Sequence, residues 1–215
     1  MRQLRLLKET SHSPEEQMSA RIVHSDLSDE ILMECLADAM RRRLEVSPFN
    51  PSYAPGVVLQ GEFLSSLTER LTAEGWQKTQ RNQIDVLISP DAKVSLQVLT
   101  GGNGTGHFKC LPSSKNKRGK RSVELFKQNS GYGQQTLWKE QKQKHWIILF
   151  RSQDEQCFCE LVFPVGVFGD LKTLRVEQRI VLPLIQIDKE GQTVKEVSPA
   201  QDVTEDIFLE VRPKA

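Results

Sequence analysis

The sequence has no long apolar run, and this absence excludes a helix that crosses a membrane. Its longest apolar runs, residues 146–150 and 161–168, fall well short of the roughly 20 residues that a membrane-spanning helix needs. The first thirty residues carry charges throughout and lack the apolar core of an export signal. We therefore expect a soluble, intracellular protein that is located in the cytoplasm and has no membrane partner.

Cysteine is scarce, and the four that are present are expected to be reduced thiols because no export signal precedes them. Cys157 and Cys159 are two residues apart on a predicted strand, so both side chains face the same way. Together with His107 and Cys110 they could supply four zinc ligands, but the spacing of the second pair is shorter than usual. Buried free cysteines are the favoured interpretation, and we expect no metal and no cofactor.

The overall composition is that of an ordinary globular protein. The chain has 215 residues, of which 38% are hydrophobic and 27% charged, and its formal net charge is +1. A chain of this length fits one domain with a sizeable core. Residues 1–25 are polar and without a period, so we predict a loosely attached N-terminal arm, followed by a single domain over residues 26–215.

Hydrophobic periodicity predicts helices first and then mostly hairpins, which is typical of an α+β fold. Ser28 is a suitable N-cap for the first helix. Val57 is expected on the apolar stripe of the second helix, and Trp76 is expected to be buried behind the helix-ending Gly75. The prediction is two N-terminal helices packed on a largely antiparallel sheet of hairpins. The helices are predicted over 28–45, 57–74 and 134–144, and the strands over 84–89, 93–100, 145–151, 157–163, 179–187, 192–197 and 207–211.

A glycine-rich loop follows the second of these strands. Its glycines are Gly101, Gly102, Gly104 and Gly106, and such a loop can turn its amides toward an anion. A phosphate-binding P-loop would continue with lysine and serine or threonine, whereas here His107 follows. We therefore favour a tight structural turn over a phosphate contact.

The distribution of charge is the strongest unusual feature. Residues 109–151 hold eleven Lys and Arg against two acids, a net charge of +9, so the rest of the chain sums to −8. Cations interleaved with aromatic residues are typical of nucleic-acid binding. The sequence therefore predicts a non-catalytic protein that binds DNA or RNA through a flexible basic loop at about 107–122. The expected contact residues are Lys109, Lys115, Lys117, Arg118, Lys120 and Arg121, and the interleaved aromatics are Phe108, Phe126, Tyr132, Trp138 and Trp146.

Two alternatives stay open. The first is an atypical metal-dependent nuclease of restriction-enzyme-like fold, with Asp85, Asp91 and Glu160 as its acids. The strand that should carry the second carboxylate offers Gln97 instead, which weighs against it. The second alternative is a protein–protein adaptor whose basic loop becomes ordered on an acidic partner.

Several short motifs occur in a recognisable order. They are residues 51–56, a helix that ends in Gly75-Trp76, a strand pair, the glycine loop over 102–106, and a basic Ser/Lys/Gly-rich stretch over 113–120. Over about residues 48–165 this order resembles a set of short uncharacterised bacterial proteins carried on mobile genetic elements. The resemblance implies a role in plasmid, phage or defence biology, and it brings no activity or catalytic residues.

Overall fold

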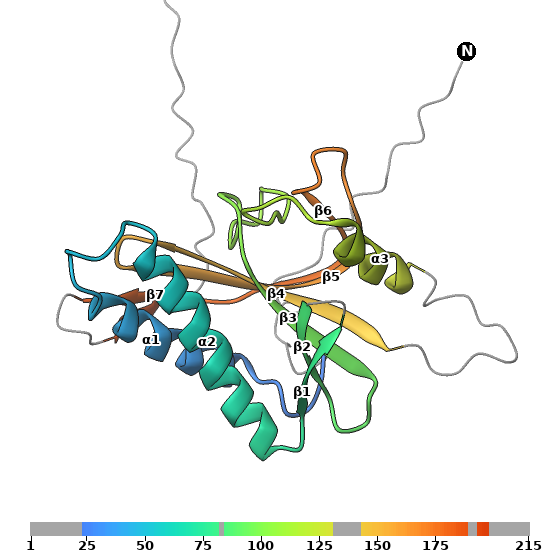
Figure 1. The fold of residues 1–215 in the computed structure, drawn as a ribbon, viewed down its shortest axis with the longest axis horizontal. Helices are drawn as coiled ribbons and strands as arrows, with labels where there is room; N and C mark the ends of the chain where they lie inside the picture. The colour runs from blue at the N-terminus through green and yellow to red at the C-terminus, as the bar shows by residue number, and fades with distance from the viewer. Residues whose placement is uncertain (1–22, 82–83, 131–142, 189–192, 198–215) are drawn as a thin grey trace, which may run out of the picture.

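The computed structural model describes residues 23–81, 84–130, 143–188 and 193–197. Within these residues three helices pack on one eight-stranded sheet. Figure 1 places α1 (Asp29–Leu44) and α2 (Ala54–Ala73) on one side of the sheet and α3 (Lys120–Asn129) on the other. The predicted α+β class is confirmed. Most of the helix expected at 134–144, the strand at 207–211 and arm residues 1–22 lie outside the described residues, and Lys144, the last residue of that expected helix, instead begins a strand.

The two N-terminal helices form where their capping and periodicity predict them. The hydroxyl of Ser28 accepts a hydrogen bond from the amide of Ile31 at 3.2 Å, as an N-cap should. The second helix begins three residues earlier than expected, with Pro55 in its first turn. Val57 is 63% exposed, so the prediction that it belongs to the apolar stripe of this helix is wrong. The buried Leu59 belongs to that stripe instead.

The sheet is antiparallel with one exception. Its order is β1-β2-β3-β4-β5-β7-β8, with β6 also paired to β5, and among the strands of the described residues only β3 and β4 run parallel. That pair needs a long crossover, which is the segment 101–143 that contains both the basic residues and α3. The strands are β1 (Gln77–Arg81), β2 (Ile84–Ile88), β3 (Val94–Thr100), β4 (Lys144–Gln153), β5 (Gln156–Val167), β6 (Leu174–Val181), β7 (Leu184–Ile187) and β8 (Thr193–Val197).

The hairpins are partly those that the sequence predicts. β4 and β5 form the expected antiparallel hairpin. The strand expected over 179–187 is instead two strands, because β6 pairs with the C-terminal half of β5 and β7 pairs with its first residues. The break between them falls at Pro183, which has no amide hydrogen to donate to a ladder. β7 then pairs with β8 as expected.

The larger core lies between the sheet and the helices α1 and α2. Cys157 and Cys159 belong to it and are fully buried, as predicted. Trp76 is also buried, and its indole donates to Asp26 at 3.2 Å. The ring of His24 packs edge-on against the same indole. The end of the expected arm, at His24, therefore packs against the domain.

The helix α3 was not predicted, because its first turn carries Lys120 and Arg121 where helix-start signals call for acids. Tertiary contacts hold it instead. Phe126 is fully buried in a second, smaller core on the opposite face of the sheet. The amide side chain of Asn129 accepts from the backbone of His145 at 3.0 Å and donates to the carbonyl of Pro164 at 2.6 Å. These bonds fix the end of α3 to β4 and β5.

Candidate functional site

The glycine-rich loop after β3 is a closed structural turn. The amide of Gly101 donates to Phe150 at 2.7 Å, that of Gly102 donates to Ser113 at 2.7 Å, and that of Gly106 donates to the carboxylate of Glu160 at 3.2 Å. These amides have internal acceptors and are not directed at a ligand. The favoured interpretation of the loop, a tight turn, therefore agrees with its hydrogen bonds.

We expect Gly106→Ala to destabilise the fold by about 1–3 kcal/mol. Gly106 has a φ of +80°, and a Cβ there would lie 2.8 Å from the Cβ of Phe158. Gly169 is a suitable control, because nothing lies within 4 Å of a Cβ added to it and its φ is not in the left-handed range. Denaturant titration of both alanine variants measures the difference, and equal midpoints would contradict the strain.

A buried ion pair between β5 and β6 anchors the glycine loop. Glu160 is fully buried and accepts from the Nε of Arg179 at 2.9 Å and from its Nη2 at 2.5 Å. The same guanidinium donates to the backbone carbonyls of Cys110 at 2.6 Å and His107 at 3.1 Å. Burial raises the pKa of Glu160, and Arg179 opposes that rise. The role of Glu160 in this structure is to anchor the loop.

The acids of the nuclease alternative do not converge. Asp85 shares a face with Leu87, which packs in the core beneath α1 and α2. Glu160 neighbours Leu161 of that core and so faces the opposite side of the sheet. Asp91 lies in a turn, where hydrogen bonds from Ser89 and from the backbone of Lys93 lower its pKa to about 2. Within the described residues no group of three or more His, Cys, Asp or Glu could hold a metal ion.

The four residues considered as zinc ligands do not converge either. The thiols of Cys157 and Cys159 belong to the core beneath α1 and α2. His107 instead contacts the ring of Phe158, with ring centroids 5.1 Å apart, and Phe158 faces the opposite side because it lies between the two cysteines on β5. The two halves of the proposed ligand set are therefore separated by the sheet.

The basic segment, expected as a flexible loop over 107–122, makes backbone hydrogen bonds to two other parts of the fold. The amide of Lys115 donates to Thr100 at 2.9 Å, that of Ser114 donates to Lys172 at 3.0 Å, and that of Arg118 donates to Leu171 at 2.7 Å. Residues 113–118 thus lie between the end of β3 and the turn that joins β5 to β6. Two further predicted contact residues, Lys120 and Arg121, begin α3 rather than belonging to a loop.

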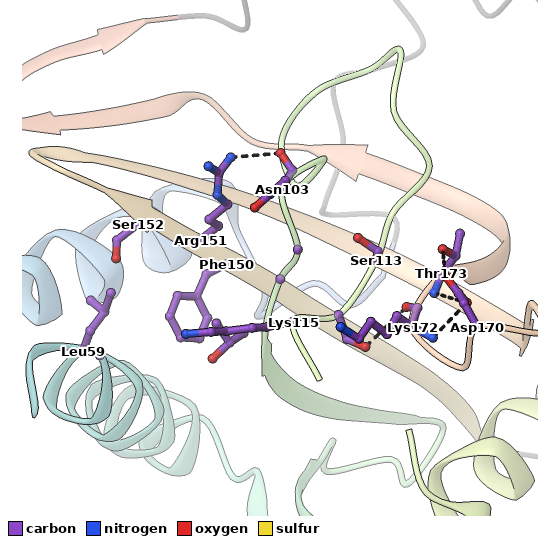
Figure 2. A pocket seen from close by; sticks show the side chains of 15 residues that line it. Leu59, Asn103, Ser113, Lys115, Phe150, Arg151, Ser152, Asp170, Lys172 and Thr173 are labelled. Carbon is purple, nitrogen blue, oxygen red and sulfur yellow. Dashed lines mark hydrogen bonds between the residues drawn. The ribbon is translucent and has the colours of Figure 1, made fainter. Parts of the chain in front are cut away.

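This packing forms a cleft of about 460 Å³ at the C-terminal end of the parallel pair β3 and β4. Figure 2 shows that its side chains come from separate parts of the chain. The lining residues belong to the ends of β3 and β4, the glycine loop at 101–103, the segment 113–115, the turn 170–173 and the first half of α2, which contributes Gly56 and Leu59.

The cleft is positively charged. It is lined by the cations Lys115, Arg151 and Lys172 and by one acid, Asp170. The carboxylate of Asp170 accepts from the hydroxyl of Thr173 at 2.6 Å and from two backbone amides of its own turn, which lower its pKa. Among the salt bridges of the described residues, none involves Lys115 or Lys172.

Arg151 is held in place at the rim of the cleft. Its guanidinium donates to the carbonyl of Asn103 at 2.9 Å and to the side chain of Gln153 at 2.7 Å, as the dashed line to Asn103 indicates in Figure 2. The hydroxyl-bearing residues Ser113 and Ser152 also line the cleft. The cleft is thus lined by cations and hydroxyl groups, which are the kinds of side chain that bind phosphates.

The predicted contact residues relate to this cleft in different ways. Lys115 lines it, and Lys117 and Arg118 continue along the same segment toward α3. Arg118 is half-buried, and burial lowers its pKa. Lys109 is exposed on the turn after the glycine loop. Sequence reasoning missed Lys172, because only the packing of segment 113–118 against the turn 170–173 brings it to the cleft.

The interleaved aromatics are mostly not available for stacking. Phe126 and Trp146 are buried in the two cores, whereas Phe108 is 44% exposed. Tyr132 and Trp138 lie outside the described residues. Of these rings, Phe108 alone is exposed among the described residues, and the prediction that they stack on bases stays a prediction.

Among the helices of the described residues, none is long and apolar enough to cross a membrane. Comparisons of the chain with protein-family models, with curated proteins and with solved structures found no match. The argument for function therefore rests on the cleft itself.

Proposed function

We propose that this protein binds nucleic acid without catalysing a reaction on it, and that the cleft receives a backbone phosphate. The observation that carries the proposal is that Lys115, Arg151 and Lys172 line one cleft, whose single acid among the described residues is engaged in its own turn. Two ammonium groups that have no carboxylate partner among the described residues leave a positive potential that an anion can neutralise. Phosphate contacts of this kind supply most non-specific affinity for nucleic acid.

The surface next to the cleft extends the same potential. Lys117 and Lys120 are exposed and take part in no ion pair within the described residues. Lys120 stands in the first turn of α3, where the helix dipole disfavours a cation, and Gly119 provides no side-chain cap. A residue that opposes local stability is a common sign of a functional role.

Lys120→Glu should therefore stabilise the protein while weakening its binding. The acid matches the helix dipole, so we expect the free energy of unfolding to rise by about 0.3–1 kcal/mol. The affinity for nucleic acid should fall, because the charge that meets the phosphates is reversed. Denaturant titration and fluorescence anisotropy measure the two effects, and Lys127→Glu, in the last turn of the same helix, is the control that should lower stability.

The proposal itself is tested by the salt dependence of binding. We expect the wild-type protein to bind labelled single-stranded and duplex DNA and RNA at low salt. With about five phosphate contacts, affinity for a single strand should fall about a hundredfold between roughly 50 and 200 mM salt. No binding at low salt, combined with tight binding of an acidic polyglutamate peptide, would favour the adaptor alternative instead.

A further inference from the structure

The first turn of α2 carries two features that the fold does not explain. Tyr53 occupies the N-cap position, which favours Ser, Thr, Asp or Asn, and it makes no capping bond and is 71% exposed. Gly56 lies one turn further on and lines the cleft. Nothing lies within 4 Å of a Cβ added to Gly56, and its backbone φ is not in the left-handed range, so neither packing nor backbone conformation requires glycine there.

The position of this turn connects it to the charged cleft. The amides of Gly56 and Val57 both donate to the carbonyl of Tyr53, at 3.1 and 3.2 Å. Tyr53 is therefore continuous with α2, which lines one side of the cleft. Gln60, one turn after Gly56, contacts the hydroxyl of Thr100 at 3.3 Å at the end of β3. Tyr53, Gly56 and Gln60 follow helical spacing along one face. The backbone of the exposed Tyr53 therefore lies about one helical turn, roughly 5 Å along the axis, from the lining of the cleft.

Further exposed apolar side chains occur close to Tyr53 in the sequence. Val57 is 63% exposed, and Phe49, in the turn before α2, is 97% exposed. Such a patch beside cations matches the two surfaces of a single-stranded nucleic acid, which offers phosphates and unstacked bases together. A duplex keeps its bases stacked inside and offers only phosphates to a hollow of this size.

We propose that the cleft selects single-stranded over double-stranded nucleic acid, with a phosphate among Lys115, Arg151 and Lys172 and the adjoining base stacked on Tyr53. Gly56 leaves the helix backbone open so that the nucleotide can approach it closely. This inference rests on the proposed function, because it assigns a strand type and a stacking residue to the same cleft.

Three probes of equal phosphate number separate the contributions of charge and base. They are a short oligothymidylate, an abasic strand of the same length and a duplex with the same number of phosphates. We expect the oligothymidylate to bind most tightly. Tyr53→Ala should weaken its binding by about fivefold to 150-fold, which is the range measured for one stacked base. The slope of affinity against salt should not change, because no cation is removed. Tyr53→Phe keeps the ring and should keep the affinity, and binding of the abasic strand should be the same in all three proteins.

The two exposed glycines of α2 provide a matched pair of variants. Gly56→Leu places a side chain in the cleft, whereas Gly61→Leu places one on the same helix away from it, and both positions have open space. We expect only Gly56→Leu to weaken binding of the oligothymidylate, while both variants remain folded.

The outcomes distinguish this inference from the proposed function. If no probe binds at low salt, the proposed function fails and the inference fails with it. If all three probes bind equally well and Tyr53→Ala and Gly56→Leu behave as the wild-type protein, the protein binds phosphates but the single-strand inference is overturned.

Discussion

Replacing Lys115, Lys117, Lys120 and Lys172 together by Gln should weaken nucleic-acid binding on the order of 10³-fold at about 50 mM salt. Each cation that neutralises a phosphate of a single strand contributes about 0.7 to the slope of affinity against salt. Removal of four such cations should therefore flatten that slope by about 2.8. All four side chains are exposed and have no ion-pair partner within the described residues, so the fold should be retained.

A charge-matched control separates this effect from net charge. Arg41, Arg42, Lys78 and Lys127 carry the same total charge and line no part of the cleft. Their replacement by Gln should change affinity much less than the cleft variant does, as anisotropy titrations at two salt concentrations would reveal. Equal reductions in affinity for the two variants would mean that binding follows the overall charge of the protein and not the cleft.

Arg179→Met should destabilise the protein by about 3–5 kcal/mol, the usual result of removing one partner from a buried ion pair. The substitution leaves the carboxylate of Glu160 fully buried without its guanidinium. It also removes the donors to the carbonyls of Cys110 and His107 that hold the loop. Denaturant titration at neutral pH measures this destabilisation, and a variant as stable as the wild-type protein would contradict the anchoring role.

The pH dependence of that variant provides a second measurement. Burial raises the pKa of Glu160, and Arg179 is the main influence that lowers it. Without Arg179 the folded pKa rises further above the unfolded one, so the folded state favours the protonated acid. Stability linked to this group is then fully present below the unfolded pKa and is lost as pH rises through the folded pKa. Arg179→Met should therefore lose less stability near pH 4.5 than near pH 7.5, whereas Arg179→Met combined with Glu160→Met should lose this pH dependence.

The sequence predicts the parts of the fold that depend on local signals. Ser28 and the apolar spacing of α1 identify the first helix, and Gly75 identifies the end of the second. The helix α3 escapes prediction because Lys120 and Arg121 contradict the usual charge of a helix start, and buried contacts of Phe126 and Asn129 override that local preference.

Only part of the candidate site can be predicted from the sequence, because the rest depends on tertiary contacts. The cluster that includes Lys115 is visible as a run of charge, but the cleft forms only where residues 113–118 pack beside the turn 170–173. No local pattern encodes that pairing, so Lys172 carries no signal of its own. Glu160 likewise becomes an anchor rather than a candidate catalytic acid only through its contact with Arg179 on the neighbouring strand.

Mapping the bound oligonucleotide onto the protein tests the central claim most directly. In a two-dimensional amide spectrum, titration with a short oligothymidylate at low salt should shift the signals of Gly56, Lys115, Arg151 and Lys172, which line the cleft. Signals of α1 and of the β1–β2 hairpin should stay unchanged. Shifts confined to α1 or to that hairpin, or no shifts at any concentration, would contradict the assignment of the cleft as a nucleic-acid site.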